Sequence, residues 1–83
     1  MGKRIGLAAF LGLLLTAPAF AADDASSCAE GIGMIRDALA SNPPESAVPK
    51  LKKALRNAER EQREGEFDEC LDAVGDARKV LGQ

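Results

Sequence analysis

Two stretches of the chain repeat one apolar spacing, and each begins with one of its two cysteines. Apolar side chains follow at intervals of four, three and four residues, which places them on one face of an α-helix. The two sets, offset by 42 residues throughout, are Cys28, Ile32, Ile35 and Leu39, and Cys70, Val74, Ala77 and Leu81. This repetition predicts two parallel helices whose core faces pack together and whose cysteines meet at one end.

The segment between these stretches predicts a third helix that returns antiparallel to the last one. Pro49 falls in its first turn, where a missing backbone N–H costs nothing. Facing positions on antiparallel helices have residue numbers with a constant sum, and one register brings the apolar stripe of this segment against that of the last helix. The stripe consists of Val48, Leu51, Leu55 and Ala58.

We therefore predict an all-α fold, a small three-helix up-down-up bundle stapled by a disulfide. Ser27 followed by Glu30 is a capping-box pattern that predicts the start of the first helix. Ser46 is the expected N-cap of the second, and Gly65 is expected to end it. The predicted helices span about residues 28–40, 47–64 and 66–81.

The same register aligns opposite charges on the last two helices. Asp68, Asp72 and Asp76 recur every four residues and so form one row. No calcium-binding loop accompanies this row, and three short helices offer no cleft for paired catalytic carboxylates. We therefore expect ion pairs across the two helices, namely Arg60 with Asp72, Arg56 with Asp76, and Arg63 with Asp68.

The N-terminus has the pattern of a cleavable secretory signal peptide. Lys3 and Arg4 precede an apolar run of about 11 residues, which is too short for the roughly 20 that span a bilayer. Small residues then allow cleavage after Ala21, with Ala22 as the less favoured site. The predicted organisation is a bacterial-type signal peptide at 1–21, a short acidic and polar tail at 22–26, and a helical domain at 27–83.

The mature part would be short and acidic. Without Lys3 and Arg4 it has 9 basic and 13 acidic residues, and a net charge of −4 rather than −2. This balance disfavours binding to nucleic acid or to an anionic membrane after cleavage. The chain has no His, which removes the commonest general base and metal ligand. We expect no cofactor, no metal and no enzymatic activity.

Cys28 and Cys70 allow three interpretations. In an oxidising compartment a small domain commonly needs a staple, which favours a structural disulfide. A redox pair is disfavoured because no Cys-x-x-Cys motif or basic neighbour lowers a thiol pKa, and two thiolates do not complete a zinc site. Lipid attachment at Cys28 is disfavoured because the preceding residues lack the usual aliphatic side chain.

A basic run at the start of the second predicted helix is a candidate partner surface. It contains Lys50, Lys52, Lys53 and Arg56, whereas residues 59–72 are strongly acidic. Such polarity can guide docking to a charged partner, although a solvated helix face has the same composition.

Residues 57–81 resemble the second half of a tetratricopeptide-type helical hairpin. Gly65, Phe67 and Cys70 match the turn of that family, and Ala58 and Ala77 match its small positions. The chain departs from the pattern where Ala54, Asn57 and Glu61 replace bulky apolar residues. The resemblance implies a single protein-binding hairpin without a ligand groove.

We expect a small helical interaction or accessory protein, periplasmic or secreted, that binds an unknown protein partner. Two alternatives remain open: a thiol-based redox or metal-handling protein that uses Cys28 and Cys70, and an envelope-anchored structural protein. The sequence does not predict the oligomeric state.

Overall fold

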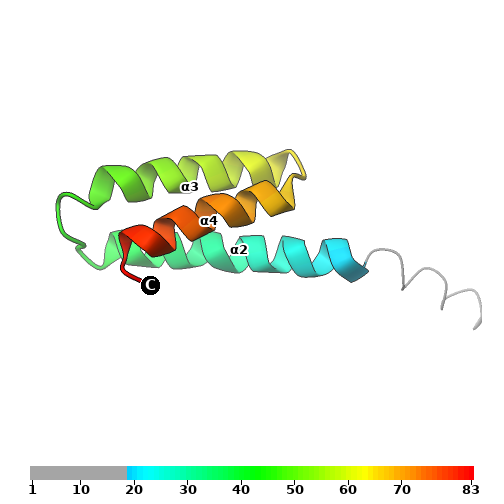
Figure 1. The fold of residues 1–83 in the computed structure, drawn as a ribbon, viewed down its shortest axis with the longest axis horizontal. Helices are drawn as coiled ribbons and strands as arrows, with labels where there is room; N and C mark the ends of the chain where they lie inside the picture. Colours follow the sequence, from blue (N-terminus) through cyan, green and yellow to red (C-terminus); the bar gives the residue numbers. More distant parts are fainter. Residues whose placement is uncertain (1–18) are drawn as a thin grey trace, which may run out of the picture.

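Three helices run up, down and up along one axis in the computed structural model, which describes residues 19–83 (Figure 1). They are α2 (Ala19–Ala40), α3 (Val48–Arg63) and α4 (Phe67–Val80). Helices α2 and α4 run in the same direction, and α3 runs against both. The described part of the chain is all-helical and contains no strand, as the sequence predicts.

Helix α2 begins at Ala19, well before the predicted start at residue 28. Ser27 and Glu30 lie inside this helix, so the capping-box prediction is wrong. Five of residues 19–29 are alanine, the strongest helix former, and this propensity outweighs a local capping signal. Residues 22–26, expected as a tail, are helical for the same reason, and the predicted cut after Ala21 falls in the first turn of α2. The rest of the predicted signal peptide, residues 1–18, lies outside the described residues.

The connection between α2 and α3 contains the sequence Ser-Asn-Pro-Pro at residues 41–44. The Ser41 hydroxyl donates a hydrogen bond to the Asp37 carbonyl at 2.8 Å, and Asn42 takes a left-handed conformation with φ of 55°. The N-cap of α3 is Ala47 without a side-chain hydrogen bond, so the prediction of Ser46 as N-cap is wrong. A tight turn, in which the Ala47 N–H donates to the Pro44 carbonyl at 2.9 Å, starts this helix instead.

Gly65 ends α3, as predicted, and turns the chain directly into α4. Its φ of +75° is a left-handed conformation that glycine adopts without steric cost. The Gly65 N–H donates to the Gln62 carbonyl at 3.1 Å, and the Glu66 N–H donates to the Glu61 carbonyl at 2.9 Å. These two bonds satisfy the last carbonyls of α3 as a Schellman motif does.

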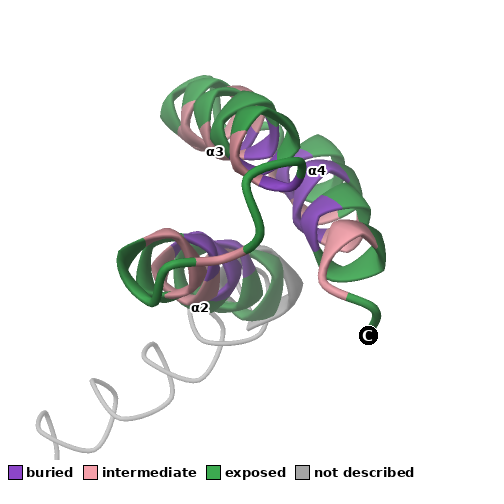
Figure 2. Ribbon diagram, turned by 90° about the vertical axis from the view of Figure 1, so that its left-hand side faces the viewer, coloured by how far each residue is buried: buried purple, intermediate pink, exposed green. Residues whose placement is uncertain are grey.

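The core lies on the central axis, where the buried faces of the three helices meet (Figure 2). All the predicted inward positions of α2 and α4 are buried or packed against the core, and Leu51 and Ala58 are buried on α3. Ala47, Ala54 and Ala73 are also buried, although the predicted stripes omit them. The fully enclosed large side chains are Ile35, Leu51, Cys28 and Cys70.

Gly31 gives the clearest sign of how closely α2 approaches α4. A Cβ atom at Gly31 would lie 2.6 Å from both methyl carbons of Val74, well inside van der Waals contact. A Cβ at Gly33 would meet nothing within 4 Å. Gly31 is therefore required by the packing of the two parallel helices, and Gly33 is not.

The three ion pairs predicted between α3 and α4 do not form in the described residues. Arg60 instead contacts its neighbour Glu61 at 3.1 Å, and Arg36 of α2 pairs with Glu59 of α3. Exposed arginine side chains are long and flexible, and they gain little from any one partner, so the nearest carboxylate competes successfully. The register predicts which backbone positions face each other, but not which exposed charges meet.

Candidate functional site

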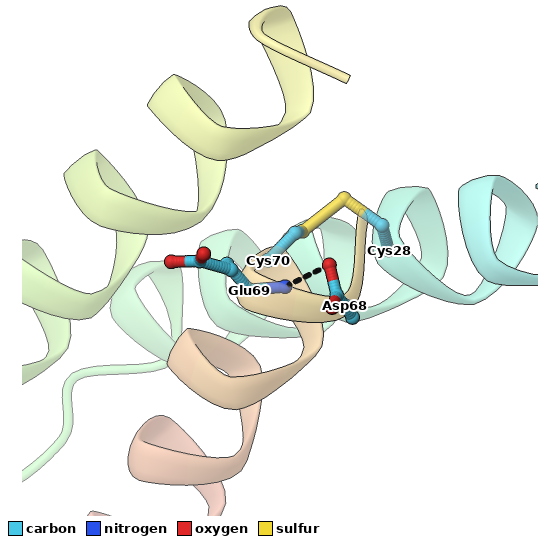
Figure 3. The surroundings of a disulfide bond; sticks show 4 residues. All are labelled: Cys28, Asp68, Glu69 and Cys70. Carbon is cyan, nitrogen blue, oxygen red and sulfur yellow. Dashed lines mark hydrogen bonds between the residues drawn. A yellow bond between two sulfur atoms is a disulfide. The ribbon is translucent and has the colours of Figure 1, made fainter. Parts of the chain in front are cut away.

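The Cys28–Cys70 disulfide joins α2 to the first turn of α4 and is present as predicted (Figure 3). The Cα atoms are 5.8 Å apart, and both cysteines have no exposed surface. A thiolate must reach a sulfur atom to exchange with a disulfide, and here packed side chains block its approach. The bond therefore acts as a permanent link between two parallel helices while the bundle stays folded.

Acidic groups surround the disulfide end of the bundle. The Glu61 carboxylate raises the pKa of Glu69 above its usual value, and Glu66, Asp68 and Asp72 add to this effect. An Asp68 carboxylate oxygen accepts the Glu69 backbone N–H at 3.0 Å, while the Glu69 side chain points away from the sulfur atoms (Figure 3). Like charges gathered this closely repel each other and leave the end of the bundle strongly negative.

Neither a metal centre nor a membrane span is present in the part of the chain that the structure describes. Across residues 19–83, no three His, Cys, Asp or Glu side chains gather as metal ligands. Over the same residues, no helix is both long enough and apolar enough to cross a bilayer.

The predicted basic surface occupies the exposed side of α3 in its N-terminal half, from residue 50 to residue 56. Lys50, Lys52, Lys53 and Arg56 are all exposed, and within residues 19–83 none of them forms an ion pair. The first turn of α3 also contains no acidic residue. Because the N-terminus of a helix has a partial positive charge, an exposed cation in the first turn is disfavoured by about 0.3–1 kcal/mol. Of the four basic residues, only Lys50 lies in this turn. We call these four residues the basic face.

A shallow hollow of about 180 Å³ lies beside the basic face, between α3 and α4. Two of its lining residues are apolar, the buried Ala54 and the partly buried Val80, and we call them its floor. The exposed lining residues Lys50 and Lys53 are its rim on α3. Asn57 of α3 and Asp76 of α4 complete the lining. The hollow therefore combines a small apolar seat with two ammonium groups, one amide and one carboxylate.

The basic face was predicted from sequence, but the hollow beside it was not. Lys52 and Arg56 do not line the hollow, but the sequence pattern does not distinguish them from Lys50 and Lys53, which do. One signal for open space beside Asp76 was present in the sequence: the antiparallel register sets Asn57 opposite Gly75, where a Cβ would meet nothing within 4 Å. A missing side chain at a helix interface leaves space.

Charge is divided along the bundle axis. The half that includes the disulfide and the α3–α4 turn (residues 23–33 and 57–72) has ten acidic and two basic residues. The other half (residues 34–56 and 73–83) has three acidic and seven basic residues. The basic face and the hollow lie in this second half, so an anionic partner is attracted to one end and repelled from the other.

Comparison with known proteins identifies no relative: no family model matches the chain, and neither a curated protein nor a solved structure is significantly similar to it. The resemblance of residues 57–81 to a tetratricopeptide hairpin stays a prediction.

Proposed function

We propose that this protein is an exported, periplasmic or secreted, accessory module without catalytic chemistry, which binds another protein through the basic face of α3. The observation that carries this proposal is the placement of Lys50, Lys52, Lys53 and Arg56. They are exposed, none of them forms an ion pair in the described chain, and Lys50 lies in the first turn of α3, where a cation is disfavoured.

Lys50 breaks a local rule of helix stability without a compensating ion pair in the described chain. Local violations of this kind concentrate at functional sites, where a binding partner supplies the missing interaction. Elsewhere the same chain obeys the rule, because α4 has Asp68 and Glu69 in its first turn and Arg78 and Lys79 in its last. A carboxylate-rich partner would neutralise the basic face and remove the cost.

Neither alternative function gains support from a specific feature. A thiol-based role needs reachable sulfur atoms, and both sulfurs here are enclosed in a bond. Lipid attachment at Cys28 needs a free thiol, whereas Cys28 is paired with Cys70.

Site-specific photo-crosslinking in the native envelope tests the proposal. A crosslinking amino acid replaces Lys53 in one strain and Arg63 in another, so both variants lose one exposed positive charge from the same helix. We expect a discrete protein adduct from position 53 and none from position 63. The same adduct should weaken when Lys50 and Lys52 are changed to Gln. Equal labelling from both positions, or no protein adduct from position 53, would contradict the proposal.

Intact mass of the protein from its own envelope fraction tests export separately. A chain that starts at Ala22 and gains about 2 Da only on reduction would support export and a closed disulfide. A mass that includes residues 1–21 or a lipid would favour the anchored alternative.

A further inference from the structure

We infer that the hollow between α3 and α4 receives one apolar side chain from an acidic segment of the protein partner. Carboxylates of the partner on either side of this apolar residue pair with Lys50 and Lys53. The inference rests on the proposed function and names the chemistry of the partner. Its basis is that an apolar floor and two unpaired ammonium groups occur together at one place.

The size of the hollow favours a side chain over a free small molecule. Pockets that hold drug-sized ligands have volumes of about 300–1,000 Å³ and enclose most of the ligand. The hollow has about 180 Å³ and is open to solvent on one side. It can bury part of one leucine or valine side chain, while the rest of the partner lies across the surface.

The charges of the rim favour an acidic segment. Lys50 and Lys53 lie one helical turn apart on the same side of the hollow, so they can meet two carboxylates on either side of a seated apolar residue. The surrounding half of the molecule has an excess of positive charge, which adds long-range attraction.

Asn57 and Asp76 set a direction for the segment. The Asn57 amide can donate to and accept from a peptide backbone, and Asp76 on the opposite rim accepts a hydrogen bond from an N–H group. A carboxylate of the partner is excluded from the Asp76 side by like charge. The partner therefore places its carboxylates over α3 and its backbone donors over α4.

Titration with defined peptides, followed by NMR of the oxidised, exported protein at low ionic strength, tests this inference. The probes are three short capped peptides: one leucine flanked by two glutamates on each side, the same peptide with serine for leucine, and the same peptide with lysines for glutamates. We expect the first peptide to shift amide signals of residues 50–57 and 76–80. The serine peptide should bind about fivefold more weakly because it loses part of the apolar burial. The lysine peptide should not bind.

Matched variants separate the hollow from the rest of the basic face. Lys50→Gln with Lys53→Gln removes two charges from the rim, and we expect about tenfold weaker binding of the leucine peptide. Lys52→Gln with Arg56→Gln removes two charges that do not line the hollow, and we expect about a twofold loss. Asn57→Leu fills the hollow and should abolish the preference for leucine over serine, whereas Gln62→Leu adds the same side chain elsewhere on α3 and should not.

The outcomes distinguish this inference from the proposed function. The inference would be overturned if the Lys50/Lys53 and Lys52/Arg56 double variants weakened binding equally. Equal binding of the leucine and serine peptides would also overturn it. Absence of any shift at residues 50–57 with millimolar peptide would overturn it too. If the crosslinked adduct at position 53 survives Asn57→Leu unchanged, the basic face binds its partner without the hollow, so the proposed function stands alone.

Discussion

At the scale of single residues, Gly31 shows how a contact between helices outweighs helix propensity. An alanine inside a helix is usually more stable than glycine by about 0.5–1 kcal/mol. At Gly31, however, the new Cβ would meet the methyl groups of Val74 at 2.6 Å. Valine has one strongly preferred rotamer in a helix, so these methyl groups cannot turn away freely. We predict that Gly31→Ala lowers the free energy of unfolding by about 1–2 kcal/mol, measured by urea denaturation.

The control for this prediction is the neighbouring glycine, which faces open space. Gly33→Ala should raise the free energy of unfolding by up to about 1 kcal/mol, because the added Cβ meets nothing within 4 Å. Gly31→Ala should become neutral or stabilising when Val74→Ala is present as well. A loss from Gly31→Ala that is the same with and without Val74 would show that the contact is not the cause.

The raised pKa of Glu69, in the acidic cluster at the disulfide end of the bundle, predicts that stability depends on pH. Its pKa is raised in the folded bundle, mainly by Glu61, so the folded state holds this proton more tightly than the unfolded state does. The stabilisation is fully present below the unfolded pKa and disappears as pH rises through the folded pKa. We predict that the urea concentration at the unfolding midpoint falls less steeply with rising pH in Glu69→Gln than in the unmodified protein. Glu45→Gln, whose position lies outside the acidic cluster, should leave the pH dependence unchanged. Parallel curves for all three proteins would exclude Glu69 as the source.

At the scale of helices, the first turn of α3 predicts a conflict between stability and binding. Lys50 lies in this turn with no acidic partner in the described chain. We predict that Lys50→Gln raises the free energy of unfolding by about 0.3–1 kcal/mol at low ionic strength, while binding to the acidic leucine peptide weakens. Lys79→Gln, in the last turn of α4, should have the opposite effect on stability because a cation is favoured there. Added salt should shrink both differences, and a stability loss from Lys50→Gln would contradict the idea.

The helices also show which features a sequence predicts well. The paired stripes that begin at Cys28 and Cys70 predict two parallel helices and the disulfide, and the apolar stripe between them predicts the antiparallel third helix. They succeed because core packing imposes a spacing that persists over about three turns. The sequence places the start of α2 too late, because the capping signal at Ser27 suggests a helix start there. The five alanines of residues 19–29 instead extend the helix toward the N-terminus. The hollow was missed because its lining depends on which side chains are absent at the α3–α4 interface, and Asn57 and Asp76 read as ordinary surface residues.

At the scale of the whole molecule, four of the eleven buried core residues are large aliphatic side chains and five are alanines. A core of this kind supplies only a few kcal/mol in a domain this small, so the disulfide accounts for a large share of the stability. With a sequence separation of 42 between its cysteines, the link can contribute up to about 4 kcal/mol by restricting the unfolded chain. We expect a chain that depends on this link to stay unfolded in a reducing compartment and to fold in an oxidising one, which is consistent with the predicted export.

We therefore predict that Cys28→Ala with Cys70→Ala, or reduction of the native protein, abolishes most of the helical signal in circular dichroism at 25 °C. Because both sulfur atoms are enclosed, a reductant can reach the disulfide only after the bundle has locally or globally unfolded. Reduction by dithiothreitol should therefore be slow in buffer and should accelerate with urea concentrations too low to unfold the protein at equilibrium. The alanine double variant should not respond to dithiothreitol, which controls for side reactions. Rapid reduction in buffer with no urea dependence would mean that the disulfide is reachable in the folded state, and it would reopen the thiol-based alternative.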